Sequence, residues 1–339
     1  MGIDLGAIVE ASPRKLDDFL GKAMAVDAFN ALYQFLSIIR QPDGTPLKDS
    51  KGRITSHLSG LLYRSANILH AGIKLVYVFD GEPPKLKAHT IEARAEVKRK
   101  AEKEWKKALE MGDLERARSK AMQTSRLTDE MVSQSKRLIE LMGIPYIQAP
   151  SEGEAQASEM ALKGDVFAVA SQDYDSLLFG APILIRNLAI TGKRKLPRKN
   201  VYVDIVPEEV SLQSVLKILG ITREQFVDLG ILIGTDFNQG IKGIGPKKAL
   251  TLLKRHSTLD AILSDLGVEI ENAKEIREFF LNPQVSSDYE LNWTDPDIEG
   301  VMKMLCDEHN FSQDRVSVAL DKFVEASKFR KQKSLDQWF

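Results

Sequence analysis

Short apolar runs alternate with amphipathic stretches in the first half of the chain. Residues 22–27, 74–80 and 166–170 read as buried strands, because each is a brief apolar run. Residues 28–36 and 55–69 have the apolar spacing of helices. A strand, a helix and a second strand in this order are typical of a parallel sheet covered by helices. The pattern therefore predicts an α/β fold.

Further helices and a short strand are predicted from residue 128 onward. Residues 128–142 read as an amphipathic helix, and a short strand follows at 144–149. Residues 208–229 and 259–325 also read as helical. The apolar run at 229–236 fits either a strand or a helix.

A highly charged segment, residues 85–126, follows the strand that ends at Asp80. A Gly-Asp pair at 112–113 divides it into two predicted helices. In the first helix, Lys87 and Arg94 lie two turns apart on one face. Apolar residues are too sparse for a packed face, so we expect a helical excursion that is poorly tethered to the core. The apolar residues are Leu86, Ile91, Val97 and Trp105.

Acidic residues close the apolar runs. Asp27, Asp80 and Asp236 each end one run, and Asp173 and Asp175 follow another. Alternate side chains of an extended segment point the same way, so Asp173 and Asp175 are expected to present two carboxylates to one point. Open α/β sheets bind ligands at the carboxyl ends of their strands. An Asx-rich turn is the alternative explanation for this pair.

Two further glutamates flank Gly153 at the start of a predicted helix. Ser151 and Glu154 match a capping box, which is a purely structural explanation for Glu154. Glycine in a first turn costs helix stability unless something approaches the backbone closely. Glu152 and Glu154 therefore also suit a metal pocket.

The recurrence of these acidic ends indicates that the carboxylates meet. Like charges about 4 Å apart repel by roughly 4 kcal/mol at an effective dielectric constant near 20. A fold that gathers them needs a cation, or must protonate some of them. Ligands that are all oxygen favour Mg²⁺ or Mn²⁺ over zinc.

Charge is unevenly distributed along the 339 residues, although the net charge is only −1. Residues 85–126 hold thirteen Lys/Arg against seven Asp/Glu, residues 186–200 hold six and no acid, and residues 242–255 hold five and no acid. Basic blocks beside a carboxylate cluster suit a polyanion that is both bound and cut. Each block taken alone also fits a solvated face.

Several classes of protein are excluded. No apolar run is long enough to span a membrane, and no secretory signal opens the chain. Gly2 is followed by Gly6 where myristoylation requires Ser or Thr. The single cysteine, Cys306, rules out an internal disulfide and a cysteine-rich zinc site. An intracellular protein with a sizeable core is expected.

Two late motifs suggest contacts with partners. Glycines at 240, 243 and 245 precede a predicted helix and stand beside Lys247 and Lys248. Backbone N–H groups freed in this way bind a phosphate without reading sequence, and a plain tight turn is the alternative. Large apolar residues close the basic tail at 332–339. They either pack into the domain or anchor the tail in a partner's pocket.

Taken together, the motifs resemble those of the flap endonucleases, the structure-specific 5′ nucleases of DNA replication and repair. The resemblance covers essentially the whole chain, and it is closest to the archaeal members, since the long lysine-rich extension of the eukaryotic ones is missing. The matching motifs are Val26-Asp27-Ala28, Tyr77-Val78-Phe79-Asp80-Gly81, Ala149-Pro150-Ser151-Glu152-Gly153-Glu154-Ala155, Ser171-Gln172-Asp173-Tyr174-Asp175 and Gly234-Thr235-Asp236-Phe237-Asn238.

The resemblance implies the PIN-like 5′ nuclease fold, in which helices flank a mixed, mainly parallel central sheet. It implies a single nuclease domain at 1–325, with a helical arch at 85–126. A helix–two-turn–helix element for duplex DNA is implied at 229–256. A basic tail with a sliding-clamp-binding motif is implied at 326–339.

The resemblance also implies two Mg²⁺ ions, with Mn²⁺ as a substitute, and a K⁺ ion at the helix–two-turn–helix element. The residues implied around one Mg²⁺ are Asp27, Asp80, Glu152 and Glu154. Those implied at the other are Asp173 and Asp175, with Asp236 acting through water. Lys87 and Arg94 match the arch-base cations that steady the scissile phosphate, and are the implied catalytic side chains.

Further implied contacts involve DNA and a sliding clamp. Tyr33 matches the aromatic side chain on which a displaced base stacks. The implied DNA-binding residues are Tyr33, Arg40, Arg64, Gly243, Gly245, Lys247 and Lys248. The implied clamp-binding residues are Gln332, Leu335, Trp338 and Phe339, with Trp338 where phenylalanine is common.

The expected function is Mg²⁺-dependent cleavage at 5′ flap junctions, with 5′–3′ exonuclease activity, in Okazaki fragment maturation and repair. We expect an intracellular monomer with no membrane contact, located with the chromosome in the cytoplasm of an archaeon, or in the nucleus of a eukaryote. The alternatives are a non-catalytic DNA-binding clamp partner and an RNA-directed nuclease of the PIN-type fold. A haloacid-dehalogenase-type phosphatase is disfavoured, because Asp27 is followed by Ala28-Phe29 and Asp175 by Ser176-Leu177.

Overall fold

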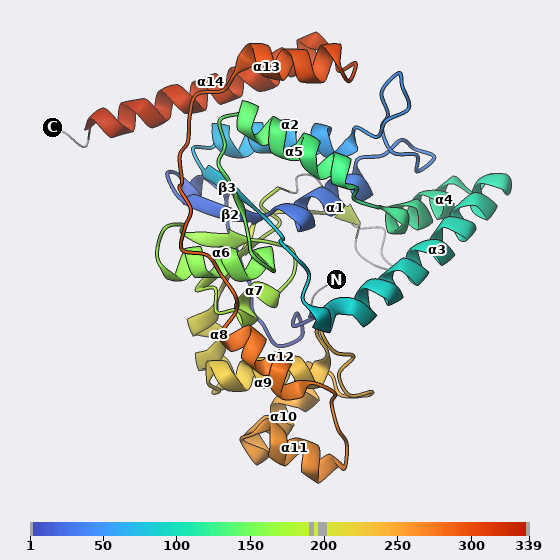
Figure 1. Ribbon diagram of the computed structural model, residues 1–339, viewed down its shortest axis with the longest axis vertical. Helices are drawn as coiled ribbons and strands as arrows, with labels where there is room; N and C mark the ends of the chain where they lie inside the picture. Colours follow the sequence, from blue (N-terminus) through green and yellow to red (C-terminus); the bar gives the residue numbers. More distant parts are fainter. Residues whose placement is uncertain (1–2, 190–192, 196–201, 337–339) are drawn as a thin grey trace.

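A mixed sheet forms the centre of the computed structural model, which describes residues 3–189, 193–195 and 202–336 (Figure 1). Within these residues the sheet has seven strands in the order β1-β9-β6-β5-β2-β3-β4. The strands from β6 to β4 run parallel, whereas β9 and β1 are antiparallel to their neighbours. The predicted mixed, mainly parallel sheet is confirmed. Its strands are β1 (Ser12–Pro13), β2 (Ala23–Asp27), β3 (Lys74–Phe79), β4 (Tyr146–Gln148), β5 (Ala168–Ala170), β6 (Ile183–Arg186) and β9 (Glu208–Ser211). A separate pair consists of β7 (Lys193–Lys195) and β8 (Tyr202–Asp204).

Helices cover both faces of the sheet (Figure 1). In the view of Figure 1, α1, α2 and α5 lie above the sheet, α6 lies below it, and α8 to α12 form the lower part of the molecule. The first set is α1 (Ala28–Ile38), α2 (Ser56–His70), α3 (Ala88–Glu110), α4 (Leu114–Ala121), α5 (Asp129–Leu141), α6 (Gly153–Leu162) and α7 (Asp175–Leu178). The second set is α8 (Leu212–Leu219), α9 (Arg223–Ile233), α10 (Pro246–His256), α11 (Leu259–Leu266), α12 (Ala273–Leu281), α13 (Ile298–Met302) and α14 (Gln313–Asp336). Short 3₁₀ or π turns occur at Leu16–Phe19, Lys85–Lys87, Met122–Thr124 and Lys303–Asp307.

Alternate residues of the central strands enter two different cores. Met24 and Val26 of β2 are buried in the core that includes α1, α2 and α5. Ala25 belongs to the opposite core with Val76, Val78 and the apolar side chains of α6. A strand buried on both faces explains why these runs are apolar throughout.

The charged segment at 85–126 forms a projecting pair of helices, α3 and α4, at the right of Figure 1. The expectation that it lacks a packed face is wrong, because small side chains supply one. Ala101 and Ala108 of α3 and Ala117 and Ala121 of α4 are buried where the two helices pack together. Alanine allows close approach of two helices without large apolar side chains.

Two predicted helical stretches contain other structure. Residues 208–211 form β9, which lies between β6 and β1 and pairs antiparallel with both, so the helix expected over 208–229 begins only after this strand. The apolar run that ends at Asp236 is helical as far as Ile233. Residues 282–297, expected to be helical, are extended and cross from α12 to α13 (Figure 1). Hydrogen bonds to other segments hold this crossing, including one from Trp293 Nε1 to the carbonyl of Leu75 at 2.7 Å.

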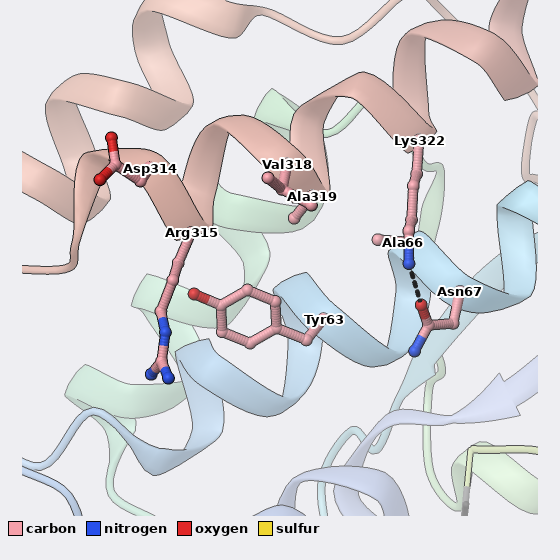
Figure 2. A pocket seen from close by; sticks show the side chains of 8 residues that line it. All are labelled: Tyr63, Ala66, Asn67, Asp314, Arg315, Val318, Ala319 and Lys322. Carbon is pink, nitrogen blue, oxygen red and sulfur yellow. Dashed lines mark hydrogen bonds between the residues drawn. The ribbon is translucent and has the colours of Figure 1, made fainter.

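Helix α14 packs along α2, and a groove of about 530 Å³ lies between them (Figure 2). Tyr63 and Arg315 face each other across this groove, and Lys322 Nζ donates to Asn67 Oδ1 at 2.7 Å. The helix continues to Asp336, so the predicted boundary between domain and tail at residue 326 lies inside α14. None of the helices within the described ranges has the length and apolarity needed to cross a bilayer.

Candidate active site

The acidic side chains singled out from the sequence lie together at one edge of the sheet. β3, β2 and β5 are adjacent parallel strands, so their carboxyl ends open at the same edge. The chain order reverses between β2 and β5, which makes this edge a topological switch point. The carboxylates gathered there are Asp27, Asp80, Glu152, Glu154, Asp173, Asp175 and Asp236, and their electrostatic interactions link them into one group.

Backbone N–H groups orient Asp27 and Asp80. Asp27 ends β2 and caps α1, where its Oδ1 accepts the N–H of Asn30 at 3.0 Å. Oδ1 of Asp80 accepts the N–H of Gly153 at 2.7 Å. A Cβ added to Gly153 would lie 2.8 Å from that oxygen. The close approach inferred from glycine in a first turn is therefore confirmed, and the approaching group is the Asp80 carboxylate.

Ser151 and Glu154 do not form the capping box that the sequence allowed. Glu152 is the N-cap residue of α6, without a side-chain cap hydrogen bond. Ser151 Oγ donates to the carbonyl of Glu82 at 3.4 Å. Oε1 of Glu154 accepts a hydrogen bond from Ser171 Oγ at 2.8 Å, so Glu154 faces the other carboxylates instead of its own helix end.

Asp173 and Asp175 reach the site by a route that differs from the prediction. β5 spans only Ala168–Ala170, and Asp175 is the first residue of α7. The argument from side-chain alternation along an extended strand is therefore wrong. Hydrogen bonds fix both carboxylates: Asp173 Oδ2 accepts from Asn30 Nδ2 at 2.9 Å, and Asp175 Oδ1 accepts the N–H of Ile3 at 2.8 Å.

Two cations from the base of the arch lie among the carboxylates. Lys87 Nζ is 2.6 Å from Oε2 of Glu152 and 3.7 Å from Oδ2 of Asp236. Arg94 Nη2 is 2.5 Å from Oδ1 of Asp236. The prediction that Lys87 and Arg94 share one face is confirmed in this respect, because both reach Asp236. Asp236 itself follows α9, in a turn closed by the bridge between Thr235 and Asn238.

Burial and mutual repulsion make the carboxylates costly to ionise. Burial, followed by the charges of neighbouring carboxylates, raises the pKa values of Asp27 and Glu154 well above their usual range. The same causes raise the pKa of Asp175 to about 7. Burial is the largest single influence on Lys87 and would lower its pKa. The charge and hydrogen bond of Glu152, together with the charges of Asp80 and Asp236, outweigh burial and raise the pKa. The site therefore favours positive charge, which Lys87 and Arg94 supply in part.

A divalent cation fits the chemistry of this site. The donors are all carboxylates, and hard cations such as Mg²⁺ prefer oxygen ligands. Within the ranges that the structure describes, no three Asp, Glu, His or Cys side chains are arranged to enclose an ion by themselves. Neutral donors and the two arch cations hold several carboxylates in their present positions. A site of this kind leaves part of an ion's coordination to water or to a phosphate.

Comparison with known proteins shows the family. Residues 2–101 match the XPG N-terminal domain, and residues 143–236 match the XPG I-region. The flap endonuclease 1 of Pyrococcus furiosus is 56% identical over 340 residues, which covers 100% of this chain and 99% of that protein. The chain belongs to the flap endonuclease family.

The structure agrees with this family. The solved flap endonuclease-1 of Methanococcus jannaschii has a TM-score of 0.78 and 43% identity, and the match covers 97% of this chain and 100% of that one. The catalytic core of Rad2 in complex with DNA substrate has a TM-score of 0.68 and 25% identity, covering 92% of this chain and 96% of that one. The present flap endonuclease is therefore a nuclease that hydrolyses phosphodiester bonds, and acts on DNA in replication and repair.

Two neutral side chains of this flap endonuclease contribute to the site without being predicted from the sequence. Asn30 and Ser171 donate hydrogen bonds to Asp173 and Glu154, respectively. Ser171 stands inside a family motif, and Asn30 lies one helical turn after Asp27. Neither has a charge or spacing that marks it as part of a site. Their positions next to motif carboxylates are the one signal that the sequence contains.

Arg186, at the end of β6, is a third residue whose role the sequence does not reveal. Its guanidinium lies 4.5 Å from the centre of the Tyr174 ring. Nε donates to the carbonyl of Gln172 at 3.1 Å, and Nη1 donates to the Tyr174 hydroxyl at 2.7 Å. These contacts hold the loop that carries Asp173 and Asp175.

The residues predicted to contact DNA lie on several elements of the flap endonuclease. Tyr33 of α1 is 37% exposed, with Lys98 Nζ of the arch 4.7 Å from its ring centre. Arg40 donates to the carbonyls of Leu36 and Gly44 and to Ser125 Oγ, so its guanidinium supports the fold locally. Burial lowers the pKa of the partly buried Arg64 on α2. Contacts of these three residues with DNA stay predictions.

The segment with Gly240, Gly243 and Gly245 joins α9 to α10. Its role as a helix–two-turn–helix element stays a prediction. Gly243 has a φ of +82°, in the left-handed region that favours glycine. Gly245 is the N-cap residue of α10, and Pro246 occupies its first turn. Lys248 Nζ donates to the carbonyl of Gly243 at 3.0 Å, and Lys247 is exposed.

The predicted clamp-binding motif falls at the end of the described chain. Gln332 and Leu335 lie on α14. Trp338 and Phe339 lie outside the described residues.

Proposed function

We propose that this flap endonuclease cuts DNA at 5′ flap junctions by two-metal-ion hydrolysis with Mg²⁺, and also has 5′–3′ exonuclease activity. The observation that carries the proposal is the meeting of buried carboxylates and arch cations at the switch point of the sheet. Lys87, between Glu152 and Asp236, is the clearest contact of this kind. A site that needs positive charge and borders a basic arch suits a divalent cation and a phosphate.

The carboxylates divide into two groups in this proposal. Asp27, Asp80, Glu152 and Glu154 hold one Mg²⁺. Asp173 and Asp175 hold the second, and Asp236 acts through water. Mn²⁺ is expected to substitute for Mg²⁺. Bound ions of this kind activate a water for in-line attack and neutralise charge on the attacking and leaving oxygens.

The arch cations are assigned to the scissile phosphate. Lys87 is largely buried, with 14% of its side chain exposed, whereas 38% of the Arg94 side chain is exposed. Both are already directed at the carboxylate site, so little rearrangement would bring them to a phosphate bound there. A fixed cation aimed at developing charge stabilises the transition state more than the ground state.

Other parts of the chain are assigned to binding the branched substrate. The exposed ring of Tyr33 suits stacking with a displaced base, since every base has a π-face. The start of α10, with Gly243, Gly245, Lys247 and Lys248, suits the phosphates of duplex DNA, with K⁺ bound at this element. Arg40 and Arg64 are assigned to duplex contacts near α1 and α2.

We also propose that the tail recruits a sliding clamp through Gln332, Leu335, Trp338 and Phe339. The enzyme is assigned as an intracellular monomer that works on the chromosome, with flap and branched DNA as its substrates. The domain limits proposed from the sequence, 1–325 for the nuclease and 326–339 for the tail, describe these functions, although α14 spans the boundary.

A product-size assay tests the proposal. A 5′-labelled flap substrate is incubated with the enzyme in Mg²⁺ or in EDTA, and the products are sized on a denaturing gel. We expect one main product, cut just inside the duplex, in Mg²⁺ and none in EDTA. Retained DNA binding without cleavage in Mg²⁺ would instead indicate a non-catalytic clamp partner. Faster cleavage of an RNA flap than of a DNA flap would indicate an RNA-directed nuclease.

A further inference from the structure

Asn30 hydrogen-bonds to acidic segments on both sides of the switch point. Its backbone N–H donates to Oδ1 of Asp27 at 3.0 Å, and its side-chain Nδ2 donates to Oδ2 of Asp173 at 2.9 Å. Oδ1 of Asn30 accepts the N–H of Gln172 at 3.3 Å. One residue of α1 therefore binds the segments that follow β2 and β5.

We propose that Asn30 is a positioning residue that fixes the spacing of Asp27 and Asp173, and thereby sets the affinity of the site for Mg²⁺. The inference rests on the proposed function, in which Asp27 and Asp173 belong to the groups around different ions. Asn30 touches neither ion in this proposal. It acts through the two carboxylates that it holds.

The chemistry of the asparagine amide matches its surroundings. A carboxylate only accepts hydrogen bonds, and a backbone N–H only donates them. The amide therefore has one satisfactory orientation, with Nδ2 toward Asp173 and Oδ1 toward Gln172. Aspartate would place a second negative charge against Asp173, and an apolar side chain would supply neither bond. Asparagine is thus selected by both neighbours at once.

These bonds oppose the repulsion between the carboxylates. The carboxylates of Asp27 and Asp173 lie close enough to interact electrostatically, so they repel each other in the absence of a cation. Asn30 engages Oδ1 of Asp27 and Oδ2 of Asp173, which is one oxygen of each carboxylate. Holding one oxygen fixes the direction in which the other points. Residues that orient metal ligands in this way typically change metal affinity by roughly 10- to 100-fold when they are replaced.

The side chain of Asn30 can be tested apart from its structural role in α1. The hydrogen bond that caps the helix uses the backbone N–H, which any residue except proline retains. Gln34 offers a matched control, because it lies one turn further along α1. It also lines the same small cavity of about 20 Å³ beside Asp27 and Asn30.

The experiment is a calorimetric titration of the full chain with Mg²⁺ alone, without DNA. Asn30→Ala removes both side-chain hydrogen bonds, and Asn30→Leu removes them while keeping the number and branching of the side-chain heavy atoms. We expect both variants to bind Mg²⁺ roughly 10- to 100-fold more weakly than wild type, and Gln34→Ala to bind it like wild type. In flap cleavage we expect a higher Mg²⁺ requirement in the Asn30 variants, with an unchanged KM for DNA and recovery toward wild-type turnover at high Mg²⁺.

Unchanged Mg²⁺ affinity in both Asn30 variants would overturn the inference and leave the proposed function intact. Failure of the wild-type chain to bind Mg²⁺ would instead overturn the proposed function. Thermal melting in EDTA shows whether each variant folds. Loss of folding in both variants would also count against a positioning role, because the cap of α1 does not depend on the side chain.

Discussion

The ammonium nitrogen of Lys87 lies 2.6 Å from Oε2 of Glu152 and joins the base of the arch to the start of α6. In this arrangement the ammonium group of Lys87 lies beside the carboxylates at which the proposed function places Mg²⁺ and the scissile phosphate. The same nitrogen lies 3.7 Å from Asp236. Lys87 therefore interacts with the acidic site before any substrate arrives.

Replacing Lys87 with alanine is expected to lower turnover much more than DNA affinity. Most of the affinity comes from contacts spread over the duplex, whereas Lys87 acts at one phosphate. A loss of about 100-fold in kcat is expected, as for other fixed groups that stabilise transition-state charge. Single-turnover cleavage and DNA titration measure the two effects. Lys85→Ala, which removes an exposed lysine two residues earlier, is the control. Equal losses in kcat and affinity for Lys87→Ala would argue against its assigned role.

Arg94→Ala is also expected to lower turnover much more than DNA affinity. It should lower the free energy of unfolding less than Lys87→Ala does. Its side chain is 38% exposed, so its removal leaves less buried surface unfilled than the removal of Lys87. The same pair of measurements applies, with the exposed Arg99 as the matched position. A variant that loses DNA binding but turns over normally once bound would show that Arg94 only helps to bind the substrate.

Gly153→Ala is expected to impair the site through Asp80. The added Cβ would lie 2.8 Å from Oδ1 of Asp80, so this carboxylate or the start of α6 must shift. A higher Mg²⁺ requirement and slower cleavage follow, since Asp80 then loses its hydrogen bond to the Gly153 N–H. Magnesium titration of the cleavage rate checks this, and DNA affinity serves as an internal control. Wild-type magnesium dependence would show that the site tolerates the displacement.

Much of the architecture follows from the sequence, because apolar runs mark buried strands wherever helices cover both faces of a sheet. The runs that end at Asp27 and Asp80 are β2 and β3, and their carboxylates lie where parallel strands open. The prediction of a helix over residues 208–211 is wrong, because the four residues of β9 lead directly into α8 and are too few to show a strand periodicity. The extended residues 282–297 were misread because their hydrogen bonds go to distant segments such as Gly143 and Leu141.

The sequence predicts the carboxylates and the arch cations of the candidate site, but not the residues that hold the carboxylates in position. Motifs alone reveal the carboxylates, because several apolar runs end in acidic residues and a fold that gathers like charges needs a cation. Asn30, Ser171 and Arg186 act through hydrogen bonds to residues that are 143, 17 and 14 positions away, and no local pattern marks such pairs. Asp173 and Asp175 were placed correctly for a wrong reason, since a turn and the start of α7 replace the expected strand.

Acid stability is expected to depend on Asp49, which links the loop before α2 to His309, just before α14. Burial would raise its pKa, but hydrogen bonds from the Arg53 backbone and side chain and from His309 outweigh burial and lower the pKa to about 2. A lowered pKa stabilises the fold above the unfolded value near 4. This contribution is lost as pH falls from about 4 to about 2. In urea unfolding across this pH window, the free energy of unfolding should fall less steeply with decreasing pH for Asp49→Asn than for wild type. Asp260→Asn, at an exposed position, is the control. Identical pH profiles for Asp49→Asn and wild type would refute the role of Asp49.

Removing the end of the tail is expected to separate clamp stimulation from cleavage. A chain that ends at Arg330 should retain basal flap cleavage and lose stimulation by a sliding clamp. The double substitution Trp338→Ala and Phe339→Ala should reproduce this loss while leaving α14 at full length. Cleavage assays with and without the clamp measure both effects. Undiminished stimulation of the truncated chain would remove the clamp assignment.

Flap cleavage by Asp173→Asn tests the central claim most directly, namely that carboxylates from distant segments act as one metal-dependent site. The substitution keeps the shape of the side chain and removes its charge. In saturating Mg²⁺ we expect single-turnover cleavage to fall by more than about 100-fold, beyond the usual effect of a residue that only orients a ligand, with flap DNA still bound. Near-wild-type cleavage by this variant would contradict the claim.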